Sequence, residues 1–353
     1  MAHESNPNDT IPVIDISSSS AEVAQQVLDA ASSHGFLFIK NDGITIPPKD
    51  ISDMFELSRQ YFQQPDEQKS EFAIHSEKAG GINRGWVKMQ GESLDPEGQK
   101  QGDPKEAFNI GTPPPNQSLQ PLPSPISTSS PLISRFQTSC HTLCTRILTL
   151  LNIALQIPDS DYFSSRHDQS LGPSGTIFRM LYYPASRKPK HSEKRESIRA
   201  GAHSDYGSLT LLFRLPGQPG LELYQQATNT WIPVPVNPSP LTLAEPPILV
   251  NIGDLLSFWT GGMLKSTVHR VAFTGDEAQE ERYSMAYFCH PLDDAALEAV
   301  PGPVIRGFVE SGKGGAELER QRERLGLQKG VEEVLTAKQH LDRRLKVTYR
   351  LKN

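Results

Sequence analysis

Three residues of this sequence have the types and spacing of a metal-binding set: His203, Asp205 and His269. His203 and Asp205 stand two residues apart at the start of a run rich in leucine, HSDYGSLTLLF. Because side chains at positions i and i+2 of an extended chain point to the same face, both could bind one ion. His269 lies in LKSTVHRVAF, where alternation places it on one face with Thr267 and Val271. The sequence therefore predicts a site made of two imidazoles and one carboxylate.

Such a set leaves three coordination positions open, which is the facial arrangement typical of non-haem Fe(II) oxygenases. O2 and a bidentate 2-oxo acid would bind there together, and the far carboxylate of that acid requires a fixed cation. The run RYSMAYFC provides one, since alternation places Arg282 and Ser284 on one face with Ala286 and Phe288. A guanidinium and a hydroxyl can hold one carboxylate through charge-assisted hydrogen bonds. We therefore predict a co-substrate anchor beside the metal.

The composition excludes several classes of protein. The 353 residues carry a net charge of −6, and the scattered Lys and Arg give no basic surface for nucleic acid. Three cysteines form neither a disulfide framework nor a zinc-finger spacing, and Cys140 and Cys144 fit buried positions of one helix. The N-terminus has no apolar leader, and no stretch approaches ~18 uninterrupted apolar residues. We expect a soluble, cytoplasmic protein without a membrane partner.

The order of expected elements indicates one globular unit, mainly β with helical additions. Residues 1–125 are predicted to form a mixed α/β region that ends in a long irregular connection over 80–125. Residues 126–310 hold a helix at about 131–155 and then, from Thr176, short β-type runs typical of an antiparallel sandwich or barrel. Residues 311–353 are expected to be helical by composition.

HSD at 203–205, the distal His269 in STVHRV and RYS at 282–284 resemble the iron(II) and 2-oxoglutarate-dependent dioxygenase superfamily. The similarity is to its isopenicillin N synthase-like branch, in fungal-type members, and it covers nearly the whole chain, including IPVIDIS, GDPKEAFNIG and NIGDLLSFWTGG. The resemblance implies a double-stranded β-helix (a jelly roll) that holds iron on His203, Asp205 and His269. It also implies that 2-oxoglutarate binds Arg282 and Ser284, with Tyr183 of LYYP close by.

The same resemblance implies the chemistry. Such an enzyme uses Fe(II), 2-oxoglutarate and O2, with ascorbate as a supporting reductant in vitro, and releases succinate and CO2. It hydroxylates, desaturates or rearranges a small organic molecule, such as a secondary metabolite. The chain departs from the pattern at Leu181, where many members have Asn in NYYP, and at Asp42, where many have His in NHGI.

Five further residues are candidates for the substrate pocket: Tyr206, Phe288, Arg179, Arg84 and Trp86. Tyr206 and Phe288 adjoin the predicted metal and anchor positions. Arg179 lies four residues before Tyr183 on the same strand face, although a surface ion pair explains it equally well. Arg84 and Trp86 belong to the irregular segment NRGW, which could cover the pocket mouth or could be a packed loop.

Two alternative functions fit the same residues. An oxidase of the isopenicillin N synthase type uses no 2-oxoglutarate, and its Arg-x-Ser pair binds the carboxylate of the substrate itself. A metal-bound binding protein would keep the pocket without turnover. The sequence leaves the substrate and the oligomeric state open.

Overall fold

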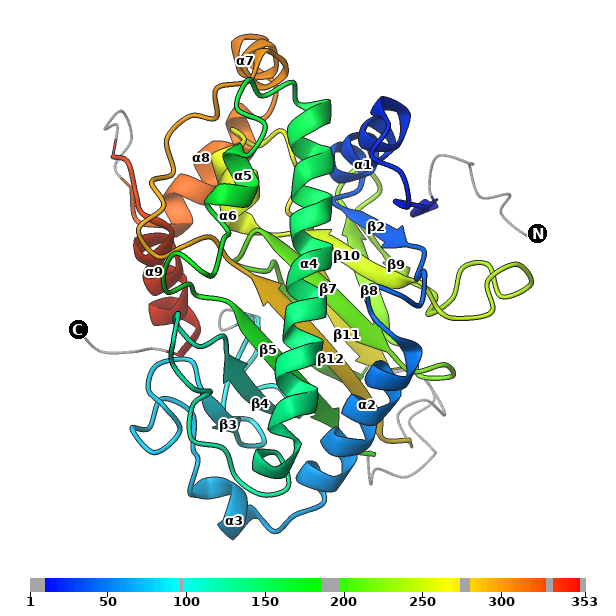
Figure 1. Cartoon of the computed structure of the whole chain (residues 1–353), viewed down its shortest axis with the longest axis vertical. Helices are drawn as coiled ribbons and strands as arrows, with labels where there is room; N and C mark the ends of the chain where they lie inside the picture. The colour runs from blue at the N-terminus through cyan, green and yellow to red at the C-terminus, as the bar shows by residue number, and fades with distance from the viewer. Residues whose placement is uncertain (1–9, 96–97, 186–196, 274–279, 328–332, 350–353) are drawn as a thin grey trace.

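The computed structural model describes residues 10–95, 98–185, 197–273, 280–327 and 333–349. Two β-sheets make up its centre, and every strand pair except β1 with β2 is antiparallel (Figure 1). The larger sheet has the order β1 (Val13–Ile14), β2 (Phe36–Ile39), β10 (Ile248–Ile252), β7 (Leu209–Arg214), β12 (Arg282–Cys289), β5 (Ile177–Tyr183), β4 (Glu106–Gly111), β3 (Gly85–Val87). The smaller has the order β6 (Ser197–His203), β11 (His269–Phe273), β8 (Leu221–Gln225), β9 (Thr230–Pro233). The fold is mainly β with helical additions around a jelly-roll core, as the sequence predicts.

Three helices cover the outer face of the larger sheet: α1 (Ala21–Ser33), α2 (Pro48–Phe62) and the long α4 (Ser130–Ala154), which crosses the sheet in Figure 1. The sequence sets the limits of α1, because the Ser20 side chain accepts a hydrogen bond from the Val23 amide at its start. Gly35 follows its end with a φ of +71°. A Cβ atom there would lie 2.3 Å from the Lys265 carbonyl oxygen, so the position requires glycine.

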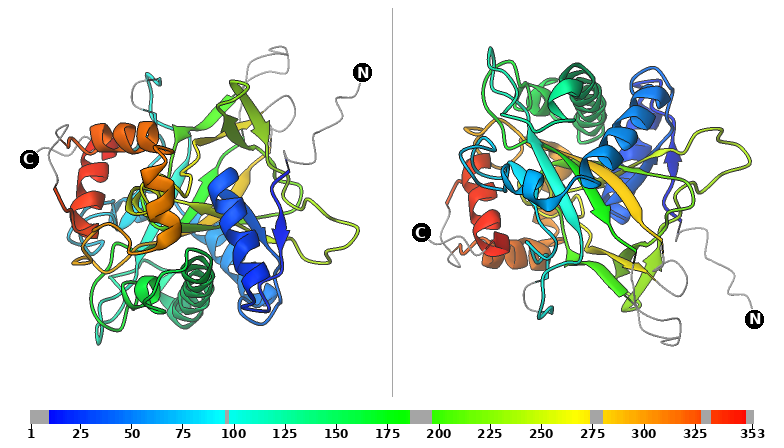
Figure 2. Two further views of the ribbon diagram at one scale, coloured as in Figure 1. Left: turned by 90° about the horizontal axis from the view of Figure 1, so that it is seen from above. Right: turned by 90° about the horizontal axis from the view of Figure 1, so that it is seen from below.

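The other helices are short or lie near the C-terminus. They are α3 (Asp66–Ser70), the 3-10 helix η2 (Ser127–Ser129), α5 (Tyr162–Ser165), α6 (Asp254–Trp259), α7 (Pro303–Glu310), α8 (Gly315–Arg324) and α9 (Ala337–Tyr349). Figure 2 shows α8 and α9 together on one side of the sheets, away from α1. No helix of the described residues is long and apolar enough to cross a bilayer.

Alternation along the strands divides the interior into two parts. On β12, Met285 and Tyr287 belong to the main hydrophobic core with residues of α4, such as Phe136. Ala286, on the opposite face, belongs to a smaller cluster with Val271 of the other sheet. Because successive strand residues point to opposite faces, one face of β12 fills the core and the other lines the space between the sheets.

The long connection predicted over 80–125 differs from that expectation. It contains β3 and β4, and β4 pairs with β5 along its whole length, from Glu106 with Tyr182 to Gly111 with Ile177. All six residues of β4 are buried, so the segment lacks the alternation of polar and apolar residues that marks a half-exposed strand. In the C-terminal region, the stretch 311–353 that was expected to be helical contains α8 and α9, whereas α7 ends just before it, and residues 328–332 and 350–353 lie outside the described part.

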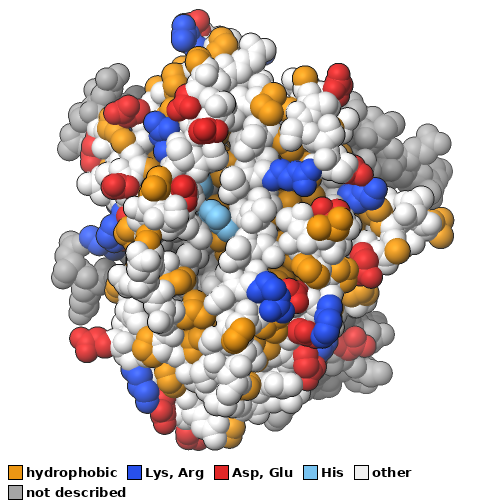
Figure 3. Space-filling view, in the orientation of Figure 1, with side chains coloured by type: hydrophobic (Ala, Val, Ile, Leu, Met, Phe, Trp, Pro, Cys, Tyr) orange, Lys and Arg blue, Asp and Glu red, His pale blue; other side chains and the backbone are white. Residues whose placement is uncertain are grey.

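The surface has no concentration of one charge on the side shown in Figure 3. Lys and Arg side chains there are interspersed with Asp and Glu, and single apolar side chains lie between them. Scattered charges of both signs are the usual solvated exterior of a globular protein.

Candidate active site

Asp205 lies in the loop that follows His203, the last residue of β6, and this loop passes a second loop at very short range. A Cβ atom on Gly253 would lie 2.1 Å from the Gly207 carbonyl oxygen, and one on Gly207 would lie 2.6 Å from the Cys289 carbonyl oxygen. Glycine at both positions therefore lets the two loops cross. Beyond the crossing, the Asp254 amide donates to the Asp205 carbonyl oxygen at 2.7 Å, which fixes the backbone of the ligand loop.

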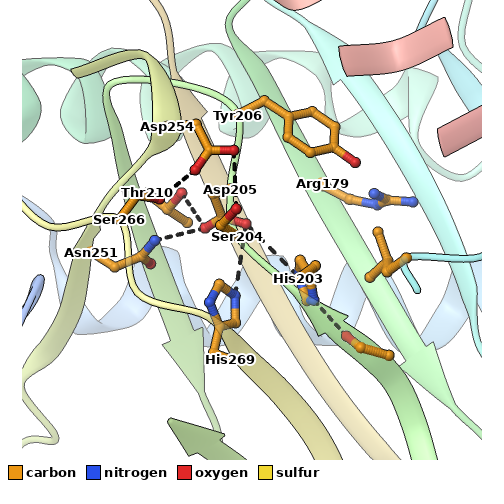
Figure 4. A network of polar contacts seen from close by, with 12 residues as sticks. Arg179, His203, Ser204, Asp205, Tyr206, Thr210, Asn251, Asp254, Ser266 and His269 are labelled. Atoms are coloured by element: carbon orange, nitrogen blue, oxygen red, sulfur yellow. Dashed lines mark hydrogen bonds and ion pairs between the residues drawn. The ribbon is translucent and has the colours of Figure 1, made fainter. Parts of the chain in front are cut away.

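The three predicted ligands come together between the sheets (Figure 4). His203 and His269 are register partners on β6 and β11, and their ring centroids lie 4.4 Å apart. The Asp205 Oδ1 atom lies 3.9 Å from His203 Nε2 and 3.8 Å from His269 Nε2. These separations are too long for hydrogen bonds, and all ligand atoms lie within 4.8 Å of one another. The arrangement leaves space for one ion between the three atoms.

Hydrogen bonds turn the correct atoms of these side chains toward that space. His203 Nδ1 lies 2.7 Å from the Gly201 carbonyl oxygen and His269 Nδ1 lies 3.1 Å from that of Thr267. Because a carbonyl only accepts, each Nδ1 carries the proton and each Nε2 presents a lone pair. Asp205 Oδ2 accepts from Thr210 Oγ1 at 2.7 Å and Asn251 Nδ2 at 2.8 Å, which leaves Oδ1 for a metal.

The charge of the set also fits a cation. Burial and the neighbouring His269 lower the pKa of His203 to about 4, so its imidazole is neutral at physiological pH. Burial alone would raise the pKa of Asp205, but the two imidazoles and the hydrogen bonds from Thr210 and Asn251 hold it below its usual value. The site therefore keeps one negative charge. Two imidazoles and a carboxylate, with three faces of the ion left open, suit divalent iron.

The predicted co-substrate residues lie along the same cavity. Arg282, Ser284 and Tyr183 all line it, and all are at least nine-tenths buried. The Arg282 guanidinium lies 4.9 Å from the centre of the Tyr183 ring and donates from Nη1 to Ser284 Oγ at 3.3 Å. Burial lowers the pKa of Arg282, but a guanidinium stays charged at neutral pH. A buried cation beside the hydroxyl of Ser284 suits the far carboxylate of a 2-oxo dicarboxylic acid.

Three of the five substrate-pocket candidates line the cavity, whose volume is about 120 Å³: Tyr206, Phe288 and Arg179. Figure 4 shows Tyr206 and Arg179 to the same side of the metal-binding set. Tyr206 bonds through its hydroxyl to Thr348 of α9. Leu181, which stands where many relatives have Asn, also belongs to the wall.

Arg84 and Trp86 differ from the expectation, because neither is in the wall of this cavity. Trp86 on β3 is buried, and its indole Nε1 donates to Glu106 Oε2 at 2.8 Å while Lys69 lies over its ring. Its side chain therefore fills the main core. Arg84 donates to the Gly80 carbonyl oxygen within its own loop. Alternation alone could not show which face of this short strand meets the cavity.

Sequence reasoning missed a buried ionic cluster in the cavity wall. Arg179 Nη2 lies 2.7 Å from both oxygens of Glu92, and Lys105 Nζ lies 3.0 Å from Glu92 and 2.7 Å from Asp103. Arg179 and Lys105 outweigh the effect of burial and hold the pKa of Glu92 far below its usual value. The Tyr349 hydroxyl of α9 donates to the same carboxylate at 2.8 Å. Arg179 does form an ion pair, as one of the two interpretations of the sequence held, but the pair is buried in the cavity wall and not on the surface.

The segment GDPKEAFNIG contains both Asp103 and Lys105, and its sequence only weakly indicates that these two side chains are buried. Its alternating charges are typical of a solvated turn. Asp103 Oδ1 also accepts from the Gly201 amide at 2.8 Å, two residues before His203. The cluster therefore connects the segment before β4 to the strand that carries the first metal ligand.

The C-terminal helix α9 completes the wall, although the sequence did not single out the residues of this helix that do so. Leu341, Leu345, Thr348 and Tyr349 of this helix line the cavity. Arg344 Nη2 lies 3.1 Å from Asp254 Oδ2, and its guanidinium lies 4.7 Å from the centre of the Tyr206 ring. The polar composition of this helix predicts that one face is exposed to solvent, but it does not predict that the opposite face packs against the cavity.

Comparison with known proteins agrees with the fold and the site. Residues 11–127 match the family model for the non-haem dioxygenase in morphine synthesis N-terminal region, and residues 175–291 match the 2OG-Fe(II) oxygenase superfamily. A 2-oxoglutarate-dependent dioxygenase of Aspergillus niger, caaD, is 30% identical over 85% of this chain and 91% of its own. A UPF0676 protein of Schizosaccharomyces pombe is 36% identical over 81% of this chain and 84% of its own.

Among solved structures, a full-length Neurospora crassa protein in complex with alpha-KG and thymine superposes with a TM-score of 0.72. It is 28% identical, and the match covers 96% of each chain. The chain belongs to the 2OG-Fe(II) oxygenase superfamily. It is an oxidoreductase that depends on Fe(II), 2-oxoglutarate and O2 and acts on a small organic molecule.

Proposed function

We propose that His203, Asp205 and His269 hold Fe(II), and that Arg282, Ser284 and Tyr183 bind 2-oxoglutarate beside it. The observation that carries this assignment is a pair of charges, one at each position, that no charged side chain of opposite sign balances within the described part of the chain. One carboxylate stands between two imidazoles, and one guanidinium stands beside a hydroxyl and an aromatic ring. When bound, the iron supplies oxidation of a C–H bond coupled to conversion of 2-oxoglutarate to succinate and CO2.

The protein's own part is to orient and to exclude water. Thr210 and Asn251 fix the free oxygen of Asp205, and the carbonyls of Gly201 and Thr267 fix the two imidazole rings. The apolar side chains of the cavity and the helix α9 limit the access of solvent to the reacting centre.

For the substrate, we propose a neutral small molecule, such as a secondary metabolite, that lies against Tyr206, Phe288 and Arg179. The Arg179 charge is already paired with Glu92, so it does not attract an anionic substrate. Thymine in the similar Neurospora crassa structure is a neutral molecule of this kind. Hydroxylation is the proposed outcome, with desaturation or ring rearrangement as variants of the same oxidation. The three buried free cysteines suit a reducing compartment, for which we propose the cytoplasm.

The test is turnover of 2-oxoglutarate with Fe(II) and ascorbate, together with thermal melting of the anaerobic Mn(II)-loaded protein. We expect 2-oxoglutarate to raise the melting temperature of the wild type. The same ligand should give no rise in His269→Ala, which lacks a metal ligand. A panel of neutral and anionic small molecules, thymine included, should show succinate formation stimulated by neutral members. An absence of any 2-oxoglutarate effect on melting and turnover would refute the assignment.

A further inference from the structure

A second arginine, Arg214, lies on the cavity side of β7 near the co-substrate anchor. The strand register pairs Arg214 with Ser284, and two residues earlier it pairs Leu212 with Ala286. Leu212, Ala286 and Ser284 all line the cavity. Because directly paired residues share a face of the sheet and alternate residues repeat it, Arg214 points to the same side as Ser284 and Arg282.

Among the described residues, the hydrogen-bond partners of Arg214 are neutral. Its Nη1 donates to the Val234 carbonyl oxygen at 2.9 Å and its Nη2 to that of Pro235 at 2.7 Å. The guanidinium lies 5.9 Å from the centre of the Phe38 ring, and the residue is 7% exposed. Arg282 likewise donates to a main-chain carbonyl, that of Pro219, at 3.0 Å. Within the described ranges of the chain, neither guanidinium forms an ion pair with a carboxylate.

Three other buried cations in the molecule differ from these two arginines, because each forms an ion pair with a carboxylate. Lys69 lies 2.6 Å from Glu106, Arg270 lies 2.7 Å from Glu222, and Arg179 is paired as described. Burial and the nearby Arg282 lower the pKa of Arg214 to about 9, so at neutral pH two unbalanced charges are buried near one another. Such a pair is costly without an anion, and a ligand carboxylate would compensate both charges.

We propose that Arg214 is a positioning residue for the co-substrate, a second cation that strengthens binding of the far carboxylate of 2-oxoglutarate at Arg282. It thereby makes the site prefer 2-oxo dicarboxylic acids over 2-oxo monocarboxylic acids. This inference rests on the proposed function, in which Arg282 is the anchor. Arg214 acts through the electrostatic field at that anchor and by holding the Val234–Pro235 backbone beside it.

The test is a double-mutant type of thermodynamic cycle, in which the charge of Arg214 and the far carboxylate of the ligand are removed separately and together. Anaerobic Mn(II)-loaded protein is titrated calorimetrically with 2-oxoglutarate and with 2-oxopentanoate, which has a methyl group in place of the far carboxylate. In Arg214→Gln we expect Kd for 2-oxoglutarate to rise about tenfold and Kd for 2-oxopentanoate to change less than about twofold. The affinity for Mn(II) should stay at the wild-type value. Equal weakening of the two acids, or no weakening of either, would overturn the proposal.

Two further variants separate charge from structure. Arg214→Lys keeps the charge but loses the fork to the two carbonyls, and it should retain the preference for the dicarboxylic acid within about threefold. If Arg214→Gln does not fold, this variant decides, and a folded Lys variant without the preference contradicts the proposal. Arg166→Gln is the matched control, since Arg166 also donates to a carbonyl, that of Tyr162, and lies over an aromatic ring.

Arg282→Gln distinguishes failure of this inference from failure of the proposed function. We expect it to raise Kd for 2-oxoglutarate about 100-fold, because it removes the direct partner of the carboxylate. If that variant binds 2-oxoglutarate normally, the anchor assignment itself is wrong. If only Arg214→Gln binds normally, the anchor stands and Arg214 has no part in it.

Discussion

Two buried polar clusters line one cavity, and they differ in how their charges balance. In the metal-binding cluster, the carboxylate of Asp205 faces two imidazoles, and among the described residues no cation neutralises it. In the other cluster, the carboxylates of Glu92 and Asp103 are matched by Lys105 and Arg179. The first cluster is an incomplete ion site, and the second is complete without any ligand.

The difference indicates where ligands bind. A balanced cluster stabilises the wall of the cavity and has no net charge to offer to a substrate, whereas an unbalanced one gains by binding an ion of opposite sign. The cavity has a negative site at Asp205 and a positive site at Arg282, and Arg214 lies on the same side of the sheet as that arginine. A divalent metal and a dianionic 2-oxo acid, which also bind each other, match these two sites.

Asp205→Asn should have the largest effect, on function rather than on folding. Loss of the anionic ligand should weaken Fe(II) or Mn(II) binding by about 10⁴-fold and abolish succinate formation. The metal-free variant should unfold with a free energy within about 1 kcal/mol of the wild type, because Thr210 and Asn251 can still donate to the amide oxygen.

Metal titration and urea unfolding of the metal-free protein measure the two quantities. Asp53→Asn, which alters an exposed pair with Lys49, is the control. A large loss of metal-free stability in Asp205→Asn would show that this cluster, too, is needed for folding.

Glu92→Gln should show the opposite pattern. It leaves Arg179 and Lys105 buried without their shared carboxylate, so we expect the free energy of unfolding to fall by about 3–5 kcal/mol. Metal affinity should change less than about threefold, because Glu92 contacts no metal ligand. Urea unfolding and Mn(II) titration at a temperature where the variant is folded provide the measurement.

The matched control for Glu92→Gln is Glu317→Gln, which removes a surface pair with Arg320. If Glu92→Gln loses the metal but keeps its stability, the distinction between the two clusters fails.

The prediction with the smallest effect at neutral pH concerns the stability of the protein in acid. Burial, with Arg344 and Arg343 nearby, lowers the pKa of His340 to about 3, against 6.5 in the unfolded chain. The unfolded state therefore binds one more proton between these values, and stability falls as the pH decreases from about 6.5 toward 3. His340→Gln should make this fall shallower by up to about 1.4 kcal/mol per pH unit. Urea unfolding of the metal-free protein at several pH values tests this, and identical slopes in the two proteins would contradict it.

Much of the fold and of the metal site is visible in the sequence because the signals are local. Alternation on β12 correctly placed Arg282, Ser284 and Phe288 on the cavity side, since a strand imposes a period of two. His203 and Asp205 also lie close together, but Asp205 follows the end of β6, so strand alternation alone does not account for their proximity. By contrast, β4 was assigned to an irregular connection because a strand buried on both faces has no alternating pattern.

The sequence alone determined the types of ligand, the faces of the strands that carry them and the family to which they belong. Only the tertiary structure decided which charges are balanced. Glu92 comes from a loop, Arg179 from β5 and Tyr349 from the last helix, and no local period relates them. Burial and charge compensation depend on contacts between distant segments, so they appear only when the chain is folded. The tertiary structure therefore made Arg179 part of a neutral wall, and among the described residues it left Arg282 and Arg214 without a carboxylate partner.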